Sequence, residues 1–125
     1  WNDKLRRGEK LTKQEEQSIK AMDSALQKMP KYEGTVKRSL SDFGIPDVDE
    51  FVKSYVPGEL KIFNEYLSSS TEVYDDSFQI QYVIRSKNGR DIRKYNSTEK
   101  EILFERGASF IVTRVDGHTI YMEEL

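Results

Sequence analysis

The chain has 125 residues, enough for one domain with a modest hydrophobic core. Its 20 Lys and Arg residues against 22 Asp and Glu residues give a net charge of −2, which argues against a general binder of nucleic acids or membrane surfaces. The sequence has no cysteine, which excludes disulfides and thiol catalysis, and its single histidine, His118, argues against a Ser-His-Asp triad or a multi-histidine metal centre. We therefore expect no metal, no nucleic acid and no membrane among its ligands.

The organisation of the chain predicts a single domain over residues 1–125, without linkers or internal repeats. Because the chain opens on Trp1 rather than Met, we expect it to be a piece of a longer protein, and its localisation is left open. The charge is uneven: residues 41–76 hold 9 acidic and 2 basic side chains, which predicts an acidic, solvated surface in the middle of the chain.

The first long helix is predicted to begin after Thr12. Thr12 suits an N-cap, and Glu15, three residues on, completes a capping box. Apolar residues then recur at helical spacing, and Pro30 ends the pattern. These apolar positions predict a helix face in contact with the core: Ile19, Met22, Leu26 and Met29.

A second, shorter helix is predicted to follow Pro46-Asp47 and to end at Pro57-Gly58. After about residue 60 the apolar pattern changes to a period of two, which predicts strands. Asn88-Gly89 is a strong hairpin signal, and Asp116-Gly117 before His118 predicts another turn. The expected strands include the runs 78–84, 102–104, 110–112 and 120–122. Helices followed by short strands favour an α+β fold with a mainly antiparallel sheet.

Two glutamates close to the run 102–104 form the most informative motif. Glu99 and Glu101 enter a predicted strand two residues apart, so their side chains point to the same face. Like charges at this distance repel and tend to raise each other's pKa. A fold that keeps both carboxylates on one face is expected to use them or to supply cationic partners.

Two segments upstream of Glu99 and Glu101 strengthen the functional interpretation of this pair. Residues 32–39 read as a strand that ends near Arg38, and residues 66–71 place a hydroxyl cluster, Ser68-Ser69-Ser70, behind Tyr66. Arg38 precedes Ser68 by 30 residues, and Ser68 precedes Glu101 by 33.

These three segments, in this order, resemble the arginine–serine–glutamate class of mono-ADP-ribosyltransferases, the family of the clostridial binary toxins and C3-like exoenzymes. Related domains occur in phage head-morphogenesis proteins. The family has an arginine at the end of a first strand, an aromatic-x-Ser-Thr-Ser strand, and a Glu/Gln-x-Glu (ExE) motif with Arg-Gly soon after, here Arg106-Gly107. The opening Asn-x-x-Leu-Arg, residues 2–6, is also similar. The resemblance implies N-terminal helices followed by a mixed, mainly antiparallel core of two sheets around an NAD cleft.

The resemblance also implies roles for the central residues. Glu101 would be the catalytic carboxylate that faces the positive charge formed when the nicotinamide–ribose bond breaks. Ser68 would hold Glu101 in place, and Arg38 would bind an NAD phosphate. The chain has Ser-Ser-Ser where the family usually has Ser-Thr-Ser, and a register that begins one residue later than Ser68 is also possible.

Further residues are implied at the edges of the site. Ser39 and Ser70 would line the NAD pocket, and Phe78 would offer its ring to the nicotinamide, although an apolar residue there suits the core equally well. Glu99 would meet the acceptor, which in this family is an arginine when glutamate stands at this position. Tyr95, in the loop before the glutamates, would contact the acceptor protein.

The resulting expectation is a transferase that uses NAD as co-substrate and modifies an accessible arginine on a partner protein. Two alternatives stay open. One is an NAD glycohydrolase, in which water is the acceptor, and the other is a phage structural module that keeps the fold without catalysis. The chain would accordingly be a secreted toxin or effector, or phage-associated.

Overall fold

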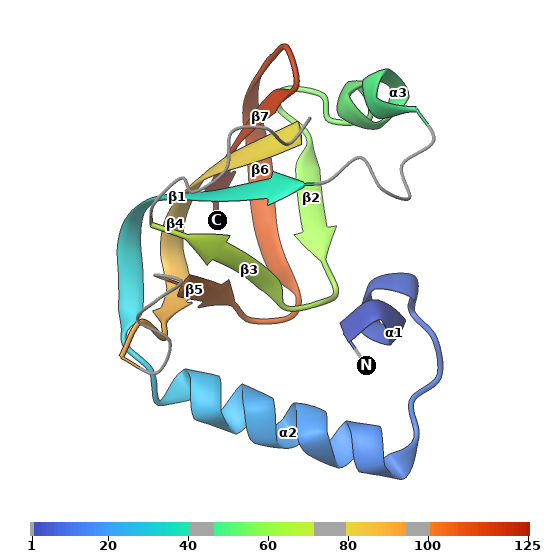
Figure 1. The fold of residues 1–125 in the computed structure, drawn as a ribbon, viewed down its shortest axis with the longest axis vertical. Coiled ribbons are helices and arrows are strands. Elements are labelled where there is room, and N and C mark those ends of the chain that lie inside the picture. The colour runs from blue at the N-terminus through green and yellow to red at the C-terminus, as the bar shows by residue number, and fades with distance from the viewer. Residues whose placement is uncertain (1, 41–46, 72–79, 95–100) are drawn as a thin grey trace.

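The computed structural model describes residues 2–40, 47–71, 80–94 and 101–125. Two helices precede the first strand, a third follows it, and the rest of the described chain is dominated by strands (Figure 1). The elements are α1 (Asn2–Arg7), α2 (Lys13–Gln27), β1 (Lys31–Leu40), α3 (Val48–Lys53), β2 (Leu60–Phe63), β3 (Leu67–Ser70), β4 (Ile80–Asp91), β5 (Glu101–Phe104), β6 (Ala108–Asp116) and β7 (Thr119–Glu124).

The helix ends follow the capping residues that the sequence predicts. Thr12 caps α2, with Glu15 N donating to Thr12 Oγ1 and Thr12 N donating to Glu15 Oε1, both at 3.1 Å, so the predicted capping box is confirmed. Asp47 caps α3. This helix ends before Ser54 and not at Pro57-Gly58, because the Ser54 hydroxyl and backbone amide both turn back to the last turn of the helix.

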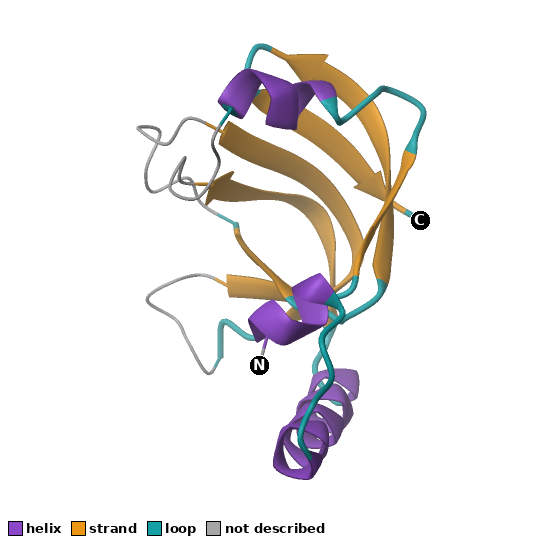
Figure 2. Ribbon diagram, turned by 90° about the vertical axis from the view of Figure 1, so that its right-hand side faces the viewer, coloured by secondary structure: helices purple, strands orange, loops and turns teal. Residues whose placement is uncertain are grey.

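The strands form one continuous sheet in the order β1-β3-β5-β4-β7-β6-β2. Strand β1 pairs with β4 as well as with β3, so β1, β3, β5 and β4 close into a small barrel, and the sheet curves strongly (Figure 2). The pairing of β4 with β7 is parallel, and the other pairings are antiparallel. The α+β class with N-terminal helices is confirmed, whereas the expected two sheets are one hydrogen-bonded sheet in the described chain.

The predicted hairpin at Asn88-Gly89 is wrong, because both residues lie inside the long strand β4. The backbone amides of Lys87 and Asn88 donate to the buried carboxylate of Glu124 at 2.7 and 2.6 Å, which satisfies them without a turn. A side chain at Gly89 would stand only 2.7 Å from Ser86 Oγ, so the glycine serves close packing. By contrast, the predicted turn between β6 and β7 is confirmed, with Gly117 at φ 60°.

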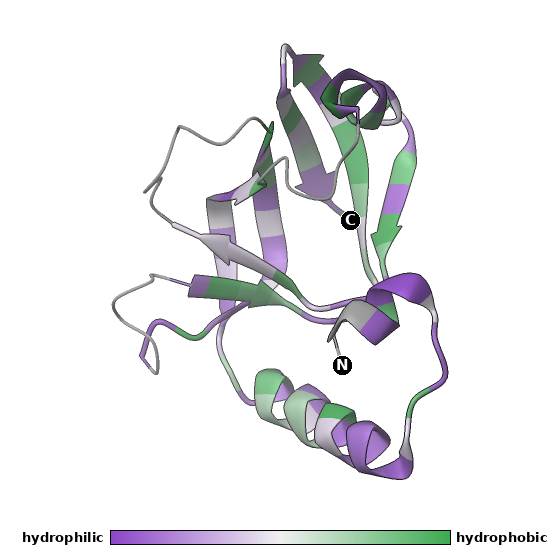
Figure 3. Cartoon of the chain, turned by 45° about the vertical axis from the view of Figure 1, so that its right-hand side comes forward, coloured by the Kyte–Doolittle hydropathy of each residue, from purple (hydrophilic) through white to green (hydrophobic). Residues whose placement is uncertain are grey.

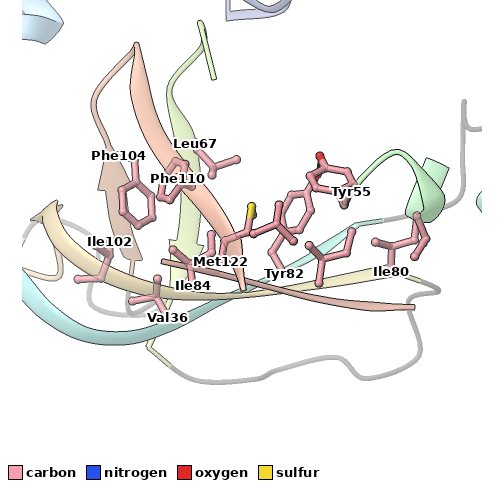
Figure 4. Close-up of a cluster of buried hydrophobic side chains, with 13 residues drawn as sticks. Val36, Tyr55, Leu67, Ile80, Tyr82, Ile84, Ile102, Phe104, Phe110 and Met122 are labelled. Carbon is pink, nitrogen blue, oxygen red and sulfur yellow. Dashed lines mark hydrogen bonds between the residues drawn. The ribbon is translucent and has the colours of Figure 1, made fainter. Parts of the chain in front are cut away.

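The hydrophobic core lies inside the curve of the sheet, and Figure 4 shows its aromatic and aliphatic side chains meeting there. Phe104 and Phe110 are fully buried and pack edge to face with ring centroids 5.1 Å apart. Strands β4, β6 and β7 supply most of the other members, which alternate with less buried positions along each strand. Figure 3 shows hydrophobic residues along these strands.

Helices α2 and α3 lie at opposite ends of the curved sheet (Figures 1 and 2). Of the apolar stripe predicted on α2, Ile19 and Leu26 are buried, and Met22 and Met29 are partly buried. Within the described ranges, no helix has the length and apolar character needed to cross a bilayer.

Candidate active site

The site is built on β1, β3 and β5, which lie side by side in the sheet. Ser70 on β3 stands opposite Glu101 on β5, and Ser68 stands two residues away on the same face of β3. The Ser68 hydroxyl donates to Glu101 Oε1 at 2.7 Å, and the Glu101 side chain is partly exposed. The Ser68 hydroxyl therefore orients the Glu101 carboxylate, although the two residues are 33 positions apart in the sequence.

Arg38 reaches the same pair from β1. Its Nη1 donates to the backbone carbonyl of Ser68 at 3.0 Å, so a guanidinium, a hydroxyl and a carboxylate lie along one connected path. Burial lowers the pKa of the Arg38 guanidinium, an effect that Arg6 reinforces and that Tyr82 and Glu101 oppose. Arg38 Nε is buried without a hydrogen-bond partner among the described residues. One donor of this guanidinium therefore lacks the acceptor that a buried N–H group ordinarily has, a feature that Arg90 Nε shares.

The geometry also distinguishes the two registers that the sequence left open for the serine cluster. The Ser69 hydroxyl points to the other face of β3 and donates to the backbone carbonyl of Ile102 at 2.7 Å. Ser70 is buried opposite Glu101. The Ser68 hydroxyl therefore meets the glutamate, whereas the Ser69 hydroxyl ties β3 to β5.

Two pairs beside Arg38 were missed by the sequence analysis. Glu65, only 6% exposed, accepts from Arg6 Nε at 2.9 Å, and both charges act electrostatically on Arg38. Tyr82 stands opposite Arg38 in the pairing of β4 with β1, and its hydroxyl is hydrogen-bonded to that of Tyr55, which follows α3.

Burial raises the pKa of both tyrosines. For the Arg6–Glu65 pair the sequence holds one signal, because the opening Asn-x-x-Leu-Arg motif contains Arg6. For Glu65 and the tyrosines no local sequence signal exists, since their partners are distant in the chain.

The remaining predicted site residues divide into two groups. Ser39 lies near the end of β1, opposite Gln81, and is partly buried next to Arg38 in the chain. The predictions for Phe78, Tyr95 and Glu99 fall outside the described residues.

Comparison with known proteins supports the fold. No protein-family model matches the chain. A protein of Mycobacterium avium (strain 104) named for NAD(+)–arginine ADP-ribosyltransferase activity, Mav, is 33% identical over 101 residues, which cover 75% of this chain and 12% of that protein. The type III effector XopAI from Xanthomonas axonopodis pv. citri superposes with a TM-score of 0.71 at 21% identity, over 86% of this chain and 48% of the effector. Exoenzyme S from Pseudomonas aeruginosa, solved with human 14-3-3 protein beta and carba-NAD, gives a TM-score of 0.76 at 20% identity, over 98% of this chain and 64% of that structure.

Plx2a, an ADP-ribosyltransferase toxin from Paenibacillus larvae, superposes with a TM-score of 0.76 at 17% identity, over 99% of this chain and 78% of that structure. The chain thus has the fold of the mono-ADP-ribosyltransferase toxins, as its three motifs predict. It is also a distant homologue of a protein named as an arginine ADP-ribosyltransferase, although it spans only about an eighth of that relative and about half of the effector.

Proposed function

We propose that this chain is a mono-ADP-ribosyltransferase that uses NAD as co-substrate and transfers ADP-ribose to an arginine of a partner protein. The observation that carries the proposal is the path from Arg38 through Ser68 to Glu101, with contacts of 3.0 and 2.7 Å. Its three residues come from strands far apart in the sequence, and the fold around them is that of ADP-ribosyltransferases.

Glu101 is the proposed catalytic carboxylate. When the bond between ribose C1′ and the nicotinamide nitrogen breaks, the electron pair leaves with nicotinamide and positive charge develops on the ribose. A carboxylate held beside that charge lowers the barrier, and it acts best when it is fixed beforehand. The hydrogen bond from Ser68 provides that fixation, because it restricts Glu101 to one orientation.

Arg38 is proposed to hold the NAD pyrophosphate. Its guanidinium is partly buried, its pKa is lowered by that burial, and one of its nitrogens is buried without a partner among the described residues. A phosphate bound at this place would compensate for the hydration free energy that the buried guanidinium loses. Ser39, Ser70 and Phe78 are proposed to complete the NAD pocket.

Glu99 and Tyr95 are proposed to face the acceptor. An arginine acceptor is protonated in water, so its nitrogen can attack C1′ only as a proton is lost. A carboxylate two residues before Glu101 can orient the guanidinium and receive that proton. Exchange of Glu99 for Gln should therefore remove labelling of arginine while nicotinamide release continues.

The test is incubation of the chain with NAD labelled in the adenine ring, a host lysate and, separately, agmatine as a small guanidine acceptor. Wild type should label protein and agmatine, and Glu101→Ala should label neither. Nicotinamide release without any acceptor product would indicate an NAD glycohydrolase. Failure of wild type to bind NAD in a calorimetric titration would contradict the proposal and favour a non-catalytic module, such as a phage structural protein. We further propose that the chain acts as part of a secreted effector or toxin.

A further inference from the structure

The Arg-Gly motif that follows the glutamates, Arg106-Gly107, is part of the family resemblance but contributes no residue to the candidate site. Arg106 follows β5 and donates through Nε to Asp23 Oδ2 on α2 at 2.9 Å, and its Nη2 forms an ion pair with the same oxygen at 2.7 Å. The other oxygen of Asp23 accepts a hydrogen bond from the hydroxyl of Tyr66. A single carboxylate therefore binds two residues from separate strands.

These two residues lie at equivalent places on the strands that carry the site. Tyr66 immediately precedes β3, and Arg106 follows β5 by two residues. The pairing of β3 with β5 has only four residue pairs, which begin at Leu67 opposite Phe104 and end at Ser70 opposite Glu101. Asp23 thus joins the two strands at the end of the ladder that is remote from Glu101.

The alignment of this ladder decides whether the site exists. A slip of one residue between β3 and β5 would turn every side chain of one strand to the opposite face and would separate Ser68 from Glu101. So short a ladder fixes its own register weakly. The contact is also well protected, because Tyr66 is only 5% exposed and burial raises its pKa, so its hydroxyl stays a donor.

Docking of α2 does not depend on Asp23 alone. Near the start of the helix Glu15 accepts from Lys4 Nζ at 2.8 Å. Just beyond its other end, Arg90 Nη1 donates to the carbonyl of Met29 at 3.0 Å. Loss of the Asp23 charge would leave these contacts in place, together with the hydrogen bond from the Tyr66 hydroxyl to the carbonyl of Ile19. It would mainly release Arg106 and so act on the pairing of β3 with β5.

We propose that Asp23 is a positioning residue, whose carboxylate clamps Tyr66 and Arg106 and so fixes the strand pairing that holds Ser68 against Glu101. Only the predicted effect of Asp23 on turnover rests on the proposed function. Its effect on the strands can be measured without any activity.

The first test compares Asp23→Asn with Glu15→Gln, which removes a carboxylate from an ion pair on the same helix without touching β3 or β5. Asp23→Asn should lower kcat for nicotinamide release about tenfold, since small misplacements of catalytic groups are costly, with KM for NAD unchanged within about twofold. In a Ser68→Ala background the same substitution should lower kcat by less than about twofold, because the contact it protects is already lost. A kcat equal to that of Glu15→Gln, or an undiminished effect in the Ser68→Ala background, would overturn the proposal.

The second test is amide hydrogen exchange by mass spectrometry on the same variants. Asp23→Asn should accelerate exchange in segments 67–70 and 102–104 and leave β6 and β7 at the wild-type rate. Uniform acceleration throughout the sheet, or none in these two segments, would contradict the clamp. If wild type proves inactive, the proposed function fails while this measurement still decides the role of Asp23.

Discussion

The two sides of the curved sheet are built from different chemistry. On the side of β1, β3 and β5, the strands are joined through hydroxyls and charges, and buried Ser69 and Ser70 occupy positions that an apolar core would fill with aliphatic groups. On the side of β6 and β7, the inward positions are Phe110, Val112, Ile120 and Met122, all at most 2% exposed. Strand β5 belongs to both sides, since Glu101 faces the site while Ile102 and Phe104 are fully buried.

This contrast indicates that the apolar side supplies most of the stability and the polar side holds the candidate site. Buried polar groups add little net stability even when they are satisfied, whereas burial of large apolar side chains drives folding. The apolar side can therefore carry the stability that lets the polar side keep a partly buried arginine beside a carboxylate. Substitutions on the two sides should then separate stability from activity.

The largest effect is expected from Phe110→Ala on the apolar side. Phe110 is fully buried and packs against both Phe104 and Phe63. Its truncation should lower the free energy of unfolding by about 3–5 kcal/mol. Urea denaturation measures the loss, and Leu60→Ala on the adjacent β2, where the side chain is 52% exposed, is the control and should cost less than about 0.5 kcal/mol. Similar losses in the two variants would contradict the assignment of the core.

Glu101→Gln should do the reverse and reduce turnover without reducing stability. Loss of the negative charge should lower kcat for nicotinamide release by about 10²–10³-fold, by analogy with other electrostatic stabilisers. The melting temperature should stay near that of wild type, because the side chain is partly exposed and the amide can still accept from Ser68. Glu123→Gln, at a partly exposed position on β7, is the control. Near wild-type turnover of Glu101→Gln would refute the catalytic assignment.

At the border between the two sides lie Tyr55 and Tyr82, and we expect this pair to make the stability of the fold fall in alkaline solution. Tyr55 and Tyr82 share a buried hydrogen bond, and burial raises the pKa of both above the ordinary value of 10.0. The folded chain therefore keeps protons that the unfolded chain releases above about pH 10, so stability is complete below that pH and is lost as the pH rises further. The loss should be about 1.4 kcal/mol per pH unit for each retained proton.

Urea denaturation between pH 8 and pH 11 measures this slope, and the double variant Tyr55→Phe/Tyr82→Phe should reduce it and leave the share of Tyr66, whose pKa burial also raises. The double variant is preferred because a single substitution would leave one hydroxyl buried without its partner. An unchanged slope in the double variant would place the alkaline sensitivity elsewhere in the molecule.

How far the sequence predicts this fold depends on the range of each signal. The capping box at Thr12 and the turn at Gly117 are local, and both were predicted correctly. Asn88-Gly89 has the same local character as a turn, yet Glu124, on the last strand, satisfies its backbone and keeps β4 extended. Local turn chemistry failed there because a tertiary contact overrode it.

The same distinction applies to the candidate site. Arg38, Ser68 and Glu101 were found because each stands in a motif with a known order along the chain. Glu65 and Asp23 stand in no motif, and their importance follows only from partners brought close by folding, namely Arg6 in one case and Arg106 in the other. Carboxylates of this kind look like ordinary surface charges until the structure shows them buried or clamped.

The smallest effect is expected for Arg38→Lys, which tests whether the polar side holds NAD. Lysine keeps the positive charge but loses the planar fork that binds phosphate oxygens in pairs, so NAD affinity should fall about tenfold. Arg85→Lys, at an exposed position on β4, makes the same exchange outside the site and should leave the affinity unchanged. Calorimetric titration gives both values. A lysine can still donate to the Ser68 carbonyl, so the melting temperature should change little. Equal affinities of wild type and Arg38→Lys would assign Arg38 to strand support alone, whereas a selective loss would place the pyrophosphate of NAD at the end of β1.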